Sequence, residues 1–215
     1  MSLAVALTAL AAPRLPGQAA TAVPHDYTQA DVDFVQGMIM HHAQAVVMSD
    51  WAPTHGARRD LLVLCKRIAL SQRDEIAMLQ RWLRARHLDV PDPLHMLPAG
   101  HGAAHDTSGA HEAGGTAMPG MDMGAHQMLM PGMLTPEEMR QLDSARGPAF
   151  DRLYLTGMIK HHQGALDMVA KLFATPRSGQ QPELFTFASE VDAGQRAEIA
   201  RMEAMLQTIT SSQTP

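Results

Sequence analysis

Two matching stretches, Gly37–His42 (GMIMHH) and Gly157–His162 (GMIKHH), determine how this chain is organised. They lie 120 residues apart, and each places a methionine three residues before one histidine and four before the next. A second methionine follows each stretch, at Met48 and at Met168. The doubled pattern predicts an internal repeat. Thioether and imidazole are ligand types that suit copper, so the pattern also raises the hypothesis of a metal site.

The repeat extends along a whole helical face. The shared positions are Asp31, Phe34, Met38, His41, Ala45 and Met48 in the first half, and Asp151, Tyr154, Met158, His161, Ala165 and Met168 in the second. Their spacing alternates between three and four residues, as expected for one face of an α-helix. A second match, between segments 71–76 and 194–199, has an offset of 123 residues. Each half therefore predicts two helices joined by a turn.

The ends of these helices are marked by capping and breaking residues. Thr28–Asp31 resembles a capping box, and Pro53 ends the helix that follows it. Thr135, Pro136 and Glu138 supply an N-cap, a first-turn proline and the second half of a capping box, and Gly147-Pro148 interrupts the helix. We therefore divide the chain into a first helical hairpin (28–87), a crossover (88–134) and a second helical hairpin (135–210).

A hairpin with one apolar face cannot bury that face by itself. The sequence therefore predicts an all-α four-helix bundle, in which the two repeated hairpins pack together and a long crossover rich in Met, His and Gly joins them. The composition agrees, because aromatic residues make up only 4% of the chain. A sheet would favour β-branched and aromatic residues.

The N-terminal segment indicates the localisation of the protein, and the net charge bears on its partners. Leu3–Ala12 is an apolar run of ten residues, too short to span a bilayer but typical of a signal peptide. We expect residues 1–27 to be a signal peptide or a disordered segment, and the protein to be periplasmic or secreted. No other segment is apolar enough for a membrane span. The net charge of −5 gives no reason to expect nucleic acid as a partner.

A polar layer is predicted halfway along the bundle. The core-facing stripes carry His41, His161, Gln72, Glu75, Gln195 and Glu198, and at about 100° per residue His42 and His162 fall on the flank. Buried glutamates are costly unless they are paired or bind a metal. Two interpretations remain open. The layer is a closed hydrogen-bond network, or the histidines bind a soft metal with Met38, Met48, Met158 and Met168 while the Gln and Glu side chains orient them from outside.

The crossover is the strongest argument for copper. Its densest part contributes Met118, Met121, Met123, His126, Met128, Met130 and Met133. Methionines in a solvated Gly/Pro-rich loop have no core to fill, and flexible clusters of thioethers can close around Cu(I) or Ag(I). The alternative is a low-complexity linker whose composition has no function.

The sequence offers no catalytic constellation, so we expect a protein that is not an enzyme. A di-metal carboxylate oxidase needs Glu-x-x-His on two helices, whereas the histidine helices here carry Met-x-x-His. Cys65 is the only cysteine and lies on an apolar stripe, where a thiol is usually inert.

The motifs Met38-Ile39-x-His41-His42 and Met158-Ile159-x-His161-His162, followed in each half by Gln-x-x-Glu-Ile, resemble a bacterial family of domains of unknown function numbered 305. The resemblance covers about Asp31 to Leu206 apart from the crossover. It implies a ferritin-like bundle outside the cytoplasm, in a family that includes CopM-type copper-binding proteins. It also implies that the paired histidines and their neighbouring methionines are ligands or lie next to ligands.

The sequence thus leads to one main hypothesis and two alternatives. The main one is an exported protein that binds Cu(I) or Cu(II), with silver as a further candidate ion, for sequestration, resistance or transfer. Its partners would be metal ions and a protein that exports or accepts copper. The alternatives are a metal-dependent oxidase and a structural or interaction module whose His–Glu layer only fixes packing.

Overall fold

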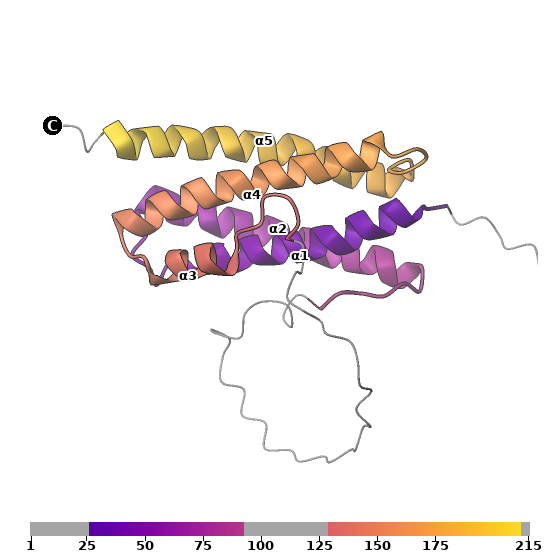
Figure 1. The fold of residues 1–215 in the computed structure, drawn as a ribbon, viewed down its shortest axis with the longest axis horizontal. Coiled ribbons are helices and arrows are strands. Elements are labelled where there is room, and N and C mark those ends of the chain that lie inside the picture. The colour runs from indigo at the N-terminus through magenta and orange to yellow at the C-terminus, as the bar shows by residue number, and fades with distance from the viewer. Residues whose placement is uncertain (1–25, 93–128, 212–215) are drawn as a thin grey trace, which may run out of the picture.

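The computed structural model describes residues 26–92 and 129–211, and within these ranges every regular element is an α-helix (Figure 1). The helices are α1 (Gln29–Trp51), α2 (Arg59–Ala85), α3 (Pro136–Ser144), α4 (Pro148–Ala174) and α5 (Pro182–Ser211). The predicted all-α fold class is confirmed. No helix in the described ranges has the length and hydropathy that a membrane crossing requires.

The predicted helix starts are confirmed in atomic detail. The Thr28 backbone N–H donates to Asp31 Oδ2 at 2.7 Å, and the Asp31 backbone N–H donates to Thr28 Oγ1 at 3.2 Å. Thr135 and Glu138 form the same reciprocal pair at the start of α3. Gly147 has φ +55°, a conformation that suits glycine, and its position between α3 and α4 gives the predicted interruption.

The helices form two hairpins that meet through their first long helices. Helix α1 packs mainly on α2, α4 packs mainly on α5, and α1 also packs on α4. Figure 1 shows the four long helices side by side, with the short α3 leading into α4. Apolar side chains form two separate core clusters, and each cluster draws residues from all four long helices.

The repeated glycines explain how closely α1 and α4 approach each other. A Cβ at Gly37 would lie 3.3 Å from Met168 Cε, and a Cβ at Gly157 would lie 3.5 Å from Met48 Cε. Each glycine thus receives the second methionine of the opposite repeat. Met48 and Met158 therefore belong to one core cluster, and Met38 and Met168 to the other. The paired histidines lie between these two contacts along the sequence of each helix.

Two equivalent aspartates tie each hairpin to the turn of the other. The Gly179 N–H, in the turn between α4 and α5, donates to Asp31 Oδ1 at 2.6 Å. The Arg58 N–H, in the turn between α1 and α2, donates to Asp151 Oδ1 at 3.2 Å. Both aspartates are buried. Burial raises the pKa of Asp151, and the contact with Arg58 partly opposes that effect.

Replacing Asp31 with alanine should lower the free energy of unfolding by about 2 to 4 kcal/mol. The change removes a capping box, which is worth about 0.5 to 2 kcal/mol, and leaves the Gly179 N–H without its charged acceptor. Urea unfolding measures the difference. The matched control is Asp33→Ala, because Asp33 is exposed on the same helix and accepts only from Gln29 among the hydrogen bonds observed. Equal effects of the two changes would contradict the tie between hairpins.

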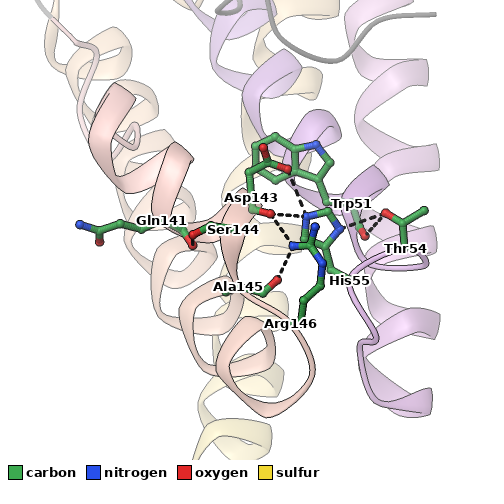
Figure 2. Close-up of polar contacts among 8 residues, drawn as sticks. All are labelled: Trp51, Thr54, His55, Gln141, Asp143, Ser144, Ala145 and Arg146. Carbon is green, nitrogen blue, oxygen red and sulfur yellow. Dashed lines mark hydrogen bonds and ion pairs between the residues drawn. The ribbon is translucent and has the colours of Figure 1, made fainter.

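A buried histidine fastens the end of α1 to α3 (Figure 2). His55 Nε2 lies 2.8 Å from the backbone oxygen of Asp143, and its Nδ1 lies 3.0 Å from Thr54 Oγ1. The His55 ring stacks on Trp51, and the His55 carbonyl accepts from the Gly147 N–H at 2.8 Å. These contacts fix where α4 begins, and through it where the second histidine pair lies.

Candidate functional site

Four histidines occupy the middle of α1 and α4, and all four are completely buried. They are His41 and His42 on α1, with His161 and His162 on α4. The sequence placed His42 and His162 on the flank of the stripe, and the structure shows that this flank is buried as well. The neighbouring helices α2 and α5 wrap far enough around α1 and α4 to cover the flank as well, so a wider arc of each helix is core.

The first histidines of the two repeats face each other. The ring centroids of His41 and His161 are 3.8 Å apart, and the ring planes are inclined by 40°. Burial lowers the pKa of His41 to about 3, and burial likewise lowers the pKa of His161 well below its ordinary value. Both rings are therefore neutral at physiological pH. A neutral imidazole is the form that binds a metal.

The second histidines contact the glutamates of the neighbouring helix. His162 Nε2 lies 2.8 Å from Glu198 Oε2, in hydrogen-bond geometry. His42 Nε2 lies 2.6 Å from Glu75 Oε2, but the oxygen is displaced from the N–H direction, so the contact is close without being well aligned. The predicted pairing of histidine with glutamate from the partner helix is thus observed for His42 and His162, not for the central pair.

The glutamates are less buried than the stripe pattern suggested. The side chain of Glu75 is 27% exposed and that of Glu198 is 13% exposed, because both stand at the edge of the layer. Burial alone would raise the pKa of Glu75, but the contact with His42 and a hydrogen bond from Ser71 bring it below its ordinary value. Their partial exposure removes much of the cost that a fully buried carboxylate would carry.

The two glutamines of the layer are buried as predicted. In the described part of the chain, the side-chain oxygens of Gln72 and Gln195 have no hydrogen-bond partner. They add acceptor atoms to the layer without closing a network. The interpretation of the layer as a completely satisfied hydrogen-bond network is therefore not supported by the observed contacts.

The end of the crossover lies against this layer. We call residues Met130–Leu134 the strap. The carbonyl oxygen of Pro131 lies 3.0 Å from His41 Nε2, so the ring nitrogen donates to it. Gln44 holds the strap by two hydrogen bonds to the backbone of Leu134, at 2.7 and 3.0 Å. The expectation of a flexible crossover up to residue 134 is therefore wrong for these last residues, because buried polar contacts fix them.

The strap also carries two of the crossover methionines. A Cβ at Gly37 would lie 3.1 Å from Met130 Sδ, so Met130 and Met168 both pack against this glycine. Met130 and Met133 are half-buried, contrary to the expectation of solvated thioethers. The other predicted crossover ligands, Met118, Met121, Met123, His126 and Met128, lie outside the described residues.

The histidine ring nitrogens that lack a hydrogen-bond partner in the described chain determine which ligands the site could bind. Among the described residues, the Nδ1 atoms of His41, His42 and His162 and both nitrogens of His161 are buried without a hydrogen bond of normal geometry. A buried polar atom without a partner is costly, so these atoms are candidates for an unmet ligand. No group of three or more His, Cys, Asp or Glu within the described ranges is arranged to hold a metal. Two imidazoles with neighbouring thioethers would suit a soft ion better than a hard one.

The single cysteine plays no part in this arrangement. Burial raises the pKa of Cys65 to about 12, so the thiol stays protonated in the neutral range. It lies in an apolar core cluster near Tyr154, whose hydroxyl is hydrogen-bonded to Ser49 at 2.8 Å. A protonated, buried thiol is neither a nucleophile nor a ready metal ligand, in agreement with the interpretation of Cys65 from the sequence.

The sequence reasoning missed Gln44, Pro131 and Gly164. Gln44 and Gly164 occupy equivalent positions in the two repeats, and they both contact the strap. The two repeats differ at this position, with a long amide side chain (Gln44) in one and a glycine (Gly164) in the other. This difference between otherwise matching helices was the sequence signal that could have revealed both residues. The contact of Pro131 with His41 had no sequence signal, because the two residues are 90 positions apart.

Known proteins share this architecture. The sequence profile of DUF305, a domain of unknown function, matches residues 31–206. A candidate secreted DUF305 protein from Streptomyces coelicolor is 23% identical, with a TM-score of 0.64 over 86% of this chain and 95% of its own. A DUF305 fragment from Deinococcus radiodurans is 25% identical, with a TM-score of 0.62 over 85% and 98%.

A third similar structure is CopM in its Cu(II)-bound form. It is 25% identical, with a TM-score of 0.57 over 83% of this chain and 96% of that chain. No curated protein matches the sequence. Because the family profile spans the described helices and both histidine pairs, this chain belongs to the DUF305 family.

Proposed function

We propose that this protein is an exported copper-binding protein that sequesters or passes on Cu(I) or Cu(II), with Ag(I) as a second ion that fits the same donors. The bundle would contribute the buried pair His41 and His161, and the crossover would contribute thioethers. In this proposal the protein binds and transfers copper, and it catalyses no reaction. A protein that exports or accepts copper would be its partner.

The observation that carries the proposal is the central imidazole pair. His41 and His161 face each other at 3.8 Å, are completely buried and are neutral at physiological pH. Each retains at least one buried ring nitrogen without a hydrogen bond in the described part of the chain. Two neutral imidazole donors suit a soft ion that accepts few ligands, and Met130 and Met168 both pack at Gly37, one helical turn before His41 on α1.

The relatives support this proposal. CopM is described in Cu(II)-bound, Cu(I)-bound and silver-bound forms. The relative from Streptomyces coelicolor supports export, as does the apolar run Leu3–Ala12. The His162–Glu198 hydrogen bond resembles those that orient imidazole ligands in metal sites, where a carboxylate accepts from the ring nitrogen that does not bind the metal, so His162 is a further candidate ligand.

Titration with Cu(I) against a competing chelator tests the proposal. We expect the full chain to compete for Cu(I). We further expect that replacing the seven crossover ligands Met118, Met121, Met123, His126, Met128, Met130 and Met133 will lower the bound stoichiometry while leaving a bundle site. Absence of any Cu(I) affinity in the wild-type protein would refute the proposal.

Two companion measurements separate the alternatives. Uptake of oxygen during repeated turnover of Cu(I) or Fe(II) would indicate a metal oxidase instead of a binding protein. A purely structural His–Glu layer would give unchanged metal binding in a His41→Ala, His161→Ala variant, with only the stability altered. The proposed site requires the bundle stoichiometry to fall in that variant.

A further inference from the structure

The strap Met130–Leu134 breaks the two-fold repeat at the histidine pair. On the α1 side, His41 donates to the Pro131 carbonyl, whereas the ring of the equivalent His161 on α4 lies near the His41 backbone without a hydrogen bond of normal geometry among the described residues. The residue three positions further on is Gln44 on α1 and Gly164 on α4. In the first repeat, the Gln44 side chain therefore binds the strap by hydrogen bonds. In the second repeat, Gly164 leaves space for the strap backbone.

Only glycine fits at position 164, because the strap backbone occupies the space that a side chain would need. A Cβ there would lie 1.9 Å from the Pro131 oxygen and 2.6 Å from Gly132 Cα, so the strap backbone occupies that volume. Gly132 has φ +75°, and a Cβ on it would lie 2.4 Å from the Lys160 carbonyl. Both obstacles are backbone atoms, which cannot rotate away as a flexible side chain can. The strap thus meets α4 backbone to backbone.

This contact decides which nitrogen of His41 carries a lone pair. A carbonyl oxygen only accepts hydrogen bonds, so the His41 Nε2 that faces Pro131 must carry the proton. In a neutral ring, Nδ1 then bears the lone pair, and Nδ1 is buried with no hydrogen bond among the described residues. A backbone carbonyl that accepts from the nitrogen opposite the metal is a common way to orient a histidine ligand.

We propose that the strap is a positioning element for His41: its Pro131 carbonyl, seated by Gln44 and Gly164, holds the ring with Nδ1 directed to accept a metal ion. Docking of the strap and loading of the histidine pair then stabilise each other. Met130, the first residue of the strap, brings one crossover thioether against the bundle at Gly37. The metal half of this inference rests on the proposed copper binding, whereas the ring positioning does not.

Gly164→Ala tests the inference, with Gly194→Ala as its matched control. Alanine is the better helix former at both positions, so α4 and α5 should remain intact. At Gly164 the new methyl group must displace the strap, whereas a Cβ at Gly194 would meet nothing within 4 Å. Gln44→Ala is a second variant, which releases the strap by removing its two hydrogen bonds instead of by a clash.

Two readouts on the full-length protein separate positioning from a general structural effect. Nitrogen-15 NMR of the apo protein should show His41 with a proton on Nε2 in the wild-type and Gly194→Ala proteins, and a mixture of tautomers in Gly164→Ala and Gln44→Ala. Competition titration with Cu(I) should show the affinity of the bundle site falling by about 10- to 100-fold in the same two variants, as is usual when the partner of a histidine ligand is lost.

The outcomes distinguish this inference from the proposed function. An unchanged His41 tautomer in both strap variants would overturn the positioning role. A changed tautomer with unchanged Cu(I) affinity would overturn the coupling to metal. If the wild-type protein binds no Cu(I), the proposed function fails, and the positioning of the ring still stands or falls on the tautomer signal.

Discussion

A leucine in place of His161 should raise the free energy of unfolding by about 1 to 2 kcal/mol while removing most of the Cu(I) affinity of the bundle. His161 is completely buried, and both of its ring nitrogens lack a hydrogen bond of normal geometry in the described chain. A buried polar group without a partner costs about 1 to 3 kcal/mol, and leucine fills a similar volume without that cost. A gain in stability together with a loss of Cu(I) affinity would support a binding role for His161.

The adjacent residue provides a matched contrast. His162→Leu should lower the free energy of unfolding, because the change leaves the partly buried Glu198 carboxylate without the partner that lies 2.8 Å away. Urea unfolding of the two apo variants should therefore give shifts of opposite sign, and Cu(I) competition should show the loss for His161→Leu. Destabilisation by both changes would indicate that His161 is an ordinary packing residue.

Acidification from pH 6.5 to pH 5 should destabilise the apo protein, with a slope that approaches about 1.4 kcal/mol per pH unit for each of the two central histidines near pH 5. Burial lowers the pKa of His41 to about 3 and that of His161 well below its ordinary value, and the neighbouring His42 and His162 lower them further. Between these folded values and the ordinary value of about 6.5, the unfolded chain binds protons that the native state does not. The free energy of unfolding therefore falls as the pH falls.

Urea unfolding across this range measures the slope. The range lies above the ordinary carboxylate pKa values of about 4, and the pKa of Glu75 is lowered further, so Glu75 contributes little to the slope. The raised pKa of Asp151 opposes the histidine slope, and this contribution is common to the wild-type protein and the control variant. The His161→Leu variant serves as the control, because it removes one of the two depressed groups and should reduce the slope near pH 5 by about 1.4 kcal/mol per pH unit. A slope that does not change in this variant would show that His161 takes up its proton in the folded state without cost.

The duplicated pattern was enough to predict the fold. Local rules decide where a helix begins, so Thr28 with Asp31, and Thr135 with Glu138, could be recognised as capping boxes from residues only three positions apart. The apolar stripes of period 3.6 also predicted which faces pack together, and the two core clusters lie on those faces. Both kinds of signal are contained in short segments of sequence.

The candidate site could be predicted only in part. The helical period placed His41 and His161 in the core, but it could not show that α2 and α5 would also bury His42 and His162. It likewise placed Glu75 and Glu198 on the stripe without showing that each would stop at the partly exposed edge. Burial depends on how far neighbouring helices wrap around a face, which a single helix does not encode.

By itself, the sequence of this protein determined two helical hairpins, their capped ends and a histidine layer rich in methionine. Only the tertiary structure decided that the His41 and His161 rings lie against each other, that Gly37 and Gly157 contact the methionines of the opposite repeat, and that the Pro131 carbonyl accepts from one ring. The physical reason is range. Capping and helical periodicity act over a few residues, whereas the strap contacts join residues that are far apart in sequence, and these depend on the exact approach of two backbones.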